Sequence, residues 1–279
     1  MKKTWLILLT GVCQLSFVGA CHAAIVASGD CGSDCYWEID GTTLNIVGTG
    51  AMTNYTHTKQ DNVGYVPSTP WYAYRSVIDT LQISDGITTM GNHAFEGLSH
   101  LSNVTLPEGL TNISTHAFIG VGALQHIDIP STVTSVGSCA FQDTGLQSIE
   151  LPEGVTRIDG LAFANTRISD IVIPSTVTVL DNRAFGDATT FDGYYNRIPL
   201  AKIYCSETLN TRCEQATEFK ESTTVPYQMT ADGKYQIGHK TYGSLGDVLT
   251  GKYIPKRIYT LEEAQAAAGK VNTVKIRYR

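Results

Sequence analysis

A repeat of 22–23 residues runs five times through residues 78–190 and restricts the chain to one class of architecture. Each copy has aliphatic or Met side chains at its start and three, five, nine and twelve residues later, and it closes with Ala-Phe. The copies start at Ile78, Leu101, Leu124, Leu146 and Ile168, and they close with Ala94-Phe95, Ala117-Phe118, Ala140-Phe141, Ala162-Phe163 and Ala184-Phe185. A fixed period of this length is typical of a solenoid, which presents an extended surface rather than a catalytic pocket.

Within each copy, the spacing predicts two short extended segments and no helix. The alternation of apolar and polar residues at the start indicates a strand with one face buried. A proline follows in four copies and ends that strand, because proline has no N–H for a ladder. We expect the phenylalanines to stack as a buried spine and a column of threonines to lie on the outer face. The threonines are Thr88, Thr111, Thr134, Thr156 and Thr178.

The copies also alternate in pairs. Leu-Pro-Glu-Gly occurs at residues 106–109 and 151–154, whereas Ile-Pro-Ser-Thr occurs at 129–132 and 173–176. This alternation indicates duplication of a two-repeat unit of about 45 residues, twice the single period.

The Ile-Pro-Ser-Thr-Val-Thr segment and the closing Ala-Phe resemble the BspA-like leucine-rich repeats of bacterial and protist surface proteins. The resemblance extends upstream over Trp37, residues 44–52 and Pro70-Trp71, and downstream to a degenerate sixth copy at Leu200, Ile203, Cys205 and Leu209. It implies a β-rich solenoid in a secreted or cell-surface protein that adheres to host or matrix proteins or to other cells. It implies no catalytic residues.

Four segments are expected along the chain. Residues 1–23 read as a signal peptide, 24–72 as an N-terminal β cap with a polar loop at 53–69, 73–217 as the solenoid, and 218–279 as a small α+β unit. In that last unit we expect a hairpin over 227–237, a helix over 261–268 and a strand over 271–279. Residues 218–224 read as a linker.

The N-terminal segment indicates export. Lys2 and Lys3 precede an apolar run, and Cys21-His22-Ala23 offers a cleavage site. The sequence Val-Gly-Ala-Cys that ends at Cys21 also fits a lipoprotein signal, in which Cys21 would be lipidated. No other apolar run approaches the roughly 20 residues of a membrane span.

Cysteine spacing predicts two disulfides, since export permits them. Cys31 and Cys35 would close one end of the solenoid, and Cys205 and Cys213 the other. A redox or metal site at Cys31 and Cys35 is the less favoured alternative, and Cys139 is expected to be a free thiol.

Charge is distributed unevenly. Residues 24–217 contain 8 basic and 20 acidic residues, whereas 218–279 contain 10 basic and 6 acidic residues. The acidic solenoid argues against nucleic acid as a partner. The basic end could pack on the acidic stack, contact anionic envelope lipid or polysaccharide, or remain a solvated surface.

No catalytic residue, cofactor or metal site is expected. His93, His116 and Cys139 occupy one column of the stack, where a shared metal ion is the less favoured alternative to a polar edge. No spacing places a base beside a nucleophile, and a small enzyme within 225–279 is a remote third hypothesis.

Binding is expected on the outward side of the first strand of each copy. The candidate residues are Gln82, Asn103, Thr105, His126, Asp128, Ser148, Glu150 and Asp170. They form no aromatic platform for a sugar, so an extracellular or host protein is the favoured partner. The sequence therefore predicts an adhesin or interaction module, with a structural scaffold of the cell envelope, docked by its basic C-terminal unit, as the alternative.

Overall fold

The computed structural model describes residues 25–60, 64–181, 183–186, 202–209, 213, 223–237 and 240–250. The predicted signal peptide, the lipidation site at Cys21, Leu200 of the sixth copy, most of the linker, the helix over 261–268 and the strand over 271–279 lie outside these residues. No helix in the described ranges is both long and apolar enough to cross a membrane.

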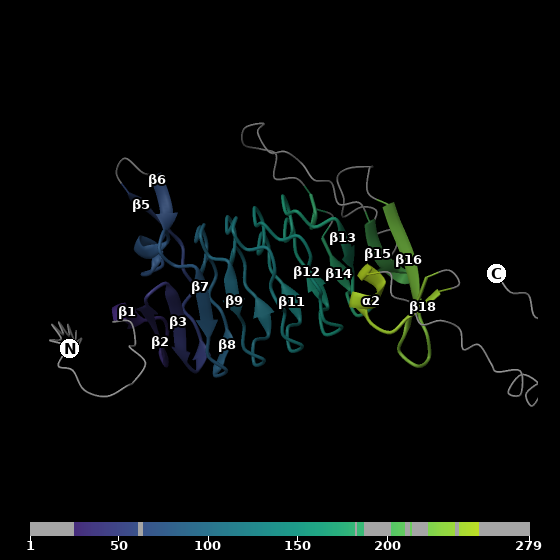
Figure 1. The fold of residues 1–279 in the computed structure, drawn as a ribbon, viewed down its shortest axis with the longest axis horizontal. Helices are drawn as coiled ribbons and strands as arrows, with labels where there is room; N and C mark the ends of the chain where they lie inside the picture. Colours follow the sequence, from purple (N-terminus) through teal and green to yellow (C-terminus); the bar gives the residue numbers. More distant parts are fainter. Residues whose placement is uncertain are drawn as a thin grey trace, which may run out of the picture.

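An antiparallel hairpin sheet opens the stack (Figure 1). It consists of β1 (Ile25–Asp30), β2 (Cys35–Asp40) and β3 (Thr43–Gly48). β3 then pairs in parallel with β7 (Thr80–Ile83), the first strand of the repeats, and β7 pairs with β9 (Asn103–Thr105). The direction of pairing therefore changes at β3, whose Leu44 lies opposite Leu81.

The polar loop expected at residues 53–69 is instead largely a hairpin. β5 (His57–Gln60) pairs antiparallel with β6 (Gly64–Pro67), and a short 3-10 helix, η1 (Tyr72–Tyr74), follows. Polar composition suggested a loop, but all four residues of β5 are exposed, so this strand lacks the apolar alternation by which a strand is recognised.

The second extended segments of the second to fifth copies form a parallel sheet on the far side of the stack. β10 (Asn112–Ile113), β11 (Ser135–Val136), β12 (Arg157–Ile158) and β14 (Val179–Leu180) pair in equivalent register. β4 (Gly50–Ala51) and β8 (Ile87–Thr89) form a pair of their own before it.

The threonine column is exposed, as predicted, and it adds hydrogen bonds between copies. Each hydroxyl from Thr111 onward donates to the carbonyl of the preceding threonine, at Oγ1–O distances of 3.1–3.2 Å. The backbone N–H of the same residue donates to that carbonyl as well. Threonine therefore serves this position both as a β-former and as a hydrogen-bond donor.

The first strand of each copy is present in three copies and absent from two. β7, β9 and β13 (Asp170–Val172) start the first, second and fifth copies, but residues 124–129 and 146–151 form no strand. Ile127 and Ile149 are nevertheless buried between exposed neighbours. The prediction of a strand in every copy is therefore wrong for two of them: alternation reports which side chains are buried, not whether the backbones are close enough for a ladder.

Beyond the fifth copy the sheet continues into the C-terminal part of the chain. β13 pairs in parallel with β15 (Lys202–Ser206), which pairs in parallel with β16 (Thr223–Met229). β17 (Tyr235–Ile237) and β18 (Lys240–Tyr242) follow antiparallel, with a turn at residues 230–234 as the Asp232-Gly233 pair predicts. A 3-10 turn, η2 (Glu207–Leu209), and a short helix, α2 (Leu245–Thr250), complete the described part.

The core is one continuous column of side chains. Every apolar position of the repeat is buried except Val104, Leu106, Ile129 and Phe185, which are partly buried. The five phenylalanine rings stack with centroids 5.4–5.6 Å apart. Trp71 extends the stack before the first copy, 6.0 Å from the ring of Phe95, and its Nε1 donates to the carbonyl of Ala94 at 2.8 Å.

The pairwise alternation of copies has a chemical basis in the turns. The Ser131 hydroxyl donates to the Glu108 carboxylate at 3.2 Å, and the Ser175 hydroxyl donates to that of Glu153 at 2.8 Å. Each Leu-Pro-Glu-Gly turn thus accepts hydrogen bonds from the Ile-Pro-Ser-Thr turn of the next copy. Two dissimilar turns form one hydrogen-bonded pair, which agrees with a two-repeat unit.

Left-handed backbone conformations recur at two positions in each of the first four copies. The residue before Ala-Phe has φ of 54–59° at His93, His116, Cys139 and Leu161. Four residues further on, φ is 54–74° at Gly97, Gly120, Asp143 and Asn165. The second set of positions is occupied by Gly, Asp and Asn, which tolerate this conformation. Leu161, in the first set, is of a residue type that adopts it only with strain.

Disulfides join Cys31 to Cys35 and Cys205 to Cys213, and these cysteines are buried at the two ends of the repeat core. Cys139 is a free thiol, and burial raises its pKa above the ordinary value.

We expect Phe118→Ala to lower the free energy of unfolding by about 3–5 kcal/mol, because it removes a fully buried ring from the middle of the stack. Urea unfolding followed by circular dichroism measures the change. Ser148→Ala, at an exposed position, should change the value by no more than about 0.5 kcal/mol. Equal effects of the two substitutions would contradict the stacked core.

At position 161, we expect Leu161→Asn to be more stable than Leu161→Ala by about 1 kcal/mol, because both remove the same contacts but only Asn tolerates φ near +59°. Thermal melts of the two variants measure the difference. An alanine variant as stable as the asparagine variant would mean that no backbone strain exists at this position.

Candidate interaction surface

The residues expected to bind a partner lie on the strand side of the stack. Gln82 lies on β7 and Asn103 and Thr105 on β9, where Thr105 is the register partner of Gln82. His126, Asp128, Ser148 and Glu150 lie on the third and fourth copies, and all seven are exposed. Asp170, on β13, is half-buried.

A hollow of about 540 Å³ opens on this side over the third and fourth copies. It brings together three of the candidate residues, His126, Asp128 and Glu150. Gln82, Asn103, Thr105, Ser148 and Asp170 do not line it. The other lining residues are Glu108, Ile127, Ile129, Ser131, Leu151, Pro152, Glu153, Gly233, Tyr235, Gly243 and Ser244.

One wall of the hollow comes from the C-terminal part of the chain. The Tyr235 hydroxyl donates to the carboxylate of Glu153, and the Tyr227 hydroxyl donates to the carbonyl of Ile173 at 2.7 Å. The rings of Tyr227 and Tyr235 meet edge to face at 5.2 Å within a small apolar cluster that includes Val172. Burial, with the neighbouring Glu153 carboxylate, raises the pKa of both phenols, so both remain hydrogen-bond donors at neutral pH.

The floor of the hollow coincides with the missing strands. Among the described residues, no backbone hydrogen bond joins residues 126–129 to residues 148–151, and the nearest bridge is the Gln147 N–H donating to the Gln125 carbonyl at 3.1 Å. Peptide groups outside a ladder still require hydrogen-bond partners, from water or from a bound chain. The corresponding peptide groups of β7 and β9 pair with one another, whereas those of residues 126–129 and 148–151 have no such pairing among the described residues.

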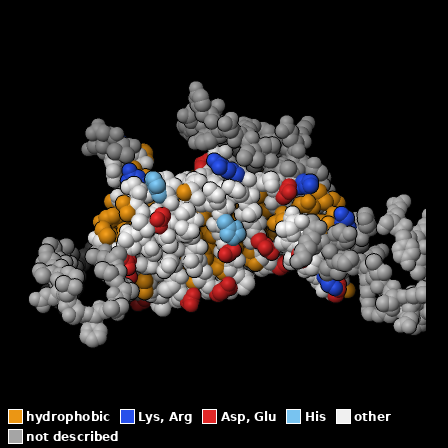
Figure 2. All heavy atoms as spheres, in the orientation of Figure 1, with side chains coloured by type: hydrophobic (Ala, Val, Ile, Leu, Met, Phe, Trp, Pro, Cys, Tyr) orange, Lys and Arg blue, Asp and Glu red, His pale blue; other side chains and the backbone are white. Residues whose placement is uncertain are grey.

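The hollow is acidic. Four carboxylates line it, those of Glu108, Asp128, Glu150 and Glu153, and none of its lining residues is Lys or Arg. His126 Nε2 lies 3.0 Å from the Asp128 carboxylate, and both side chains are well exposed. Figure 2 shows acidic side chains gathered beside a histidine in the middle of this side. Such a lining suits cationic groups of a partner.

Sequence reasoning missed Glu108, Glu153 and Tyr235. The two glutamates occupy turns of the same form in alternate copies, and that recurrence was the available signal. Tyr235 belongs to the predicted hairpin, but the position of that hairpin over the fourth copy depends on long-range packing that no local pattern encodes.

The column of His93, His116 and Cys139 does not converge on one point. The rings of His93 and His116 stack 4.5 Å apart and nearly parallel, at 6°. Imidazole lone pairs lie in the ring plane, so stacked parallel rings direct them side by side rather than toward a shared ion. In the described part of the chain, the residues whose ligand atoms do converge are His57, His93 and Glu96.

Residues 70–192 match the family described as the BspA type leucine rich repeat region, in six copies. A leucine-rich repeat protein from Eubacterium ventriosum has a similar solved structure, with 28% identity and a TM-score of 0.51 over 66% of this chain. This chain covers 45% of the length of that protein. No curated protein sequence matches the chain.

Two further solved structures are similar at lower identity. A leucine rich cell surface protein from Faecalibacterium prausnitzii has 20% identity and a TM-score of 0.38, over 74% of this chain and 59% of its own. The leucine-rich repeat protein of T. pallidum has 22% identity and a TM-score of 0.41, over 64% of this chain and 90% of its own.

We expect Tyr235→Phe to loosen the wall of the hollow, because the hydrogen bond to the Glu153 carboxylate is lost at a cost of about 1.5–3 kcal/mol. Hydrogen exchange of the amides of residues 235–237 should become faster, while that of residues 112–113 on β10 should not change. Unaltered exchange in β17 would show that this hydrogen bond does not hold the wall.

Proposed function

We propose that this chain, whose residues 70–192 belong to the BspA type of leucine-rich repeat regions, binds a partner protein outside the cell through a basic segment of that partner. The segment would lie in the acidic hollow over the third and fourth copies. The role is that of an adhesin or interaction module, and no catalytic step is invoked.

The observation that carries the proposal is the charge of the hollow. Glu108, Asp128, Glu150 and Glu153 converge on it from three successive copies without a lysine or arginine among the lining residues. Like charges gathered in one concavity favour association with the opposite charge, and they also increase the rate of encounter.

Two features favour a protein as the partner. The break in the ladder leaves peptide groups of residues 126–129 and 148–151 without backbone partners in each other's copy, and the peptide groups of a partner protein are one class of hydrogen-bond partner for them. The aromatic side chain in the lining, Tyr235, is buried and does not present a ring for stacking a sugar.

The extracellular location rests on the N-terminal sequence and on the family. The predicted signal peptide directs the chain to export, and one similar protein of known structure is described as a cell surface protein. Two disulfides in the fold are compatible with an oxidising compartment.

The test is binding of the purified protein to oligolysine and to a panel of soluble extracellular matrix proteins, in low and in high salt. We expect Asp128→Lys with Glu150→Lys to weaken oligolysine binding by about tenfold or more, because two attractive contacts become repulsive. Biolayer interferometry gives the dissociation constants.

The matched control is Asp34→Lys with Asp85→Lys, which changes the net charge by the same amount at exposed positions outside the hollow. Equal weakening by both pairs would show that only net charge matters and would contradict a site in the hollow. Binding only to anionic envelope material, lost in high salt, would instead support a scaffold docked by the basic C-terminal end.

A further inference from the structure

We propose that His57, His93 and Glu96 form a binding site for a divalent transition-metal ion, with zinc as the representative ion, which fastens the β5–β6 hairpin to the first repeat. The site lies at the first copy, where none of its residues lines the acidic hollow, and it is independent of partner binding there.

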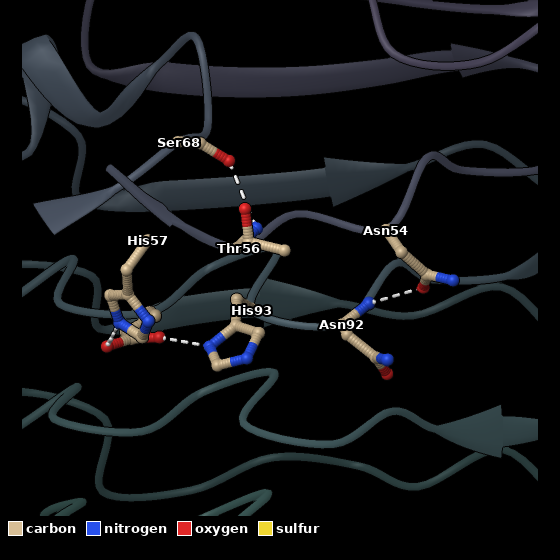
Figure 3. Close-up of polar contacts among 7 residues, drawn as sticks. Asn54, Thr56, His57, Ser68, Asn92 and His93 are labelled. Atoms are coloured by element: carbon tan, nitrogen blue, oxygen red, sulfur yellow. Dashed lines mark hydrogen bonds and ion pairs between the residues drawn. The ribbon is translucent and has the colours of Figure 1, made fainter. Parts of the chain in front are cut away.

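Both histidine side chains contact the carboxylate of Glu96. His57 Nε2 lies 2.8 Å from Glu96 Oε1, and His93 Nδ1 lies 2.6 Å from Glu96 Oε2. The rings of His57 and His93, both labelled in Figure 3, lie edge to face with their centroids 4.8 Å apart. All ligand atoms lie within 4.8 Å of one another, so small side-chain rotations bring them to the spacing of about 3.3 Å that a tetrahedral ion with bonds of about 2.0–2.1 Å requires.

The donor set matches the chemistry of zinc. Two imidazoles and one carboxylate are a known ligand combination for zinc, with a fourth position left for water. The glutamate side chain is 18% exposed and that of His93 17%, whereas His57 is 35% exposed, so the ion would be reached from the hairpin side. Such partial burial excludes much of the competing water while leaving an entry path.

The backbone around the site is already fixed. The Tyr55 N–H donates to the Asn92 carbonyl at 3.0 Å, and the Asn92 N–H donates to Asn54 Oδ1 at 2.9 Å, which holds the chain before His57 against the first copy. This approach requires Gly91, because a Cβ there would lie 1.8 Å from the Thr53 carbonyl oxygen. Preorganised backbone on both sides reduces the ordering that metal binding must impose.

The first copy differs from the others where the ligands lie. The position of Glu96 is occupied by Ile119, Gln142, Ala164 and Gly186 in the later copies. The His93 position is left-handed in the first four copies, so the repeat itself supplies the conformation. The carboxylate occurs only in the copy that the hairpin approaches with His57.

Isothermal titration of the metal-free, tag-free protein with zinc tests the proposal. We expect one ion per chain at this site, and affinity at least about a hundredfold weaker in both His57→Gln and Glu96→Gln, since even second-shell changes cost 10- to 100-fold. Cobalt in place of zinc should give the visible absorption of a tetrahedral site, which His57→Gln removes.

The controls are His126→Gln, at the other exposed histidine–carboxylate pair, and Cys139→Ser, at the free thiol. Both should retain the binding. Zinc should also slow hydrogen exchange of the amides of residues 57–60 and 64–66 in the unmodified protein. Absence of saturable binding, or binding unchanged in His57→Gln, would overturn the proposal; His57 lies on an exposed strand outside the repeats, so its variant decides the matter even if Glu96→Gln fails to fold.

Discussion

The whole structure depends on one constraint: a single copy of the repeat cannot bury its own apolar side chains. Each phenylalanine ring is covered by the rings before and after it, so the copies stabilise one another in sequence, and the first and last of them need some other cover. Trp71 and the sheet of β1, β2 and β3 cover the first copy. The strands β15 and β16 extend the last one. These added segments also bring residues from outside the repeats next to repeat residues, and both proposed sites include such residues.

The sequence specifies the parts of this fold that depend on burial. The aliphatic spacing predicts the core and the closing Ala-Phe predicts the stacked spine, because each copy repeats the same environment. The hairpin at Asp232-Gly233 is predicted as well, since turn residues act locally. The β5–β6 hairpin is missed, because four exposed residues carry no apolar period.

The candidate site is predicted only in part, for a related reason. Alternation places His126, Asp128 and Glu150 on the outer side correctly, but it cannot show that the backbones of the third and fourth copies lack a ladder. Nor can it place Tyr235 opposite Glu153, a contact between residues 82 positions apart. A hollow is a property of how elements pack together, and it emerges only when the stack and the C-terminal strands are assembled.

The missing ladder has a mechanical consequence. A rod joined by hydrogen bonds along both sides resists bending equally in either direction. Here the far side is paired continuously from β10 to β14, whereas on the strand side the described strands pair only before the third copy and after the fourth. The far sheet would therefore serve as a hinge, and bending about it would change the spacing between the third and fourth copies on the strand side. With fewer backbone hydrogen bonds across it, the strand side of the third and fourth copies is expected to bend more easily than the far side, at the place where a partner is proposed to enter.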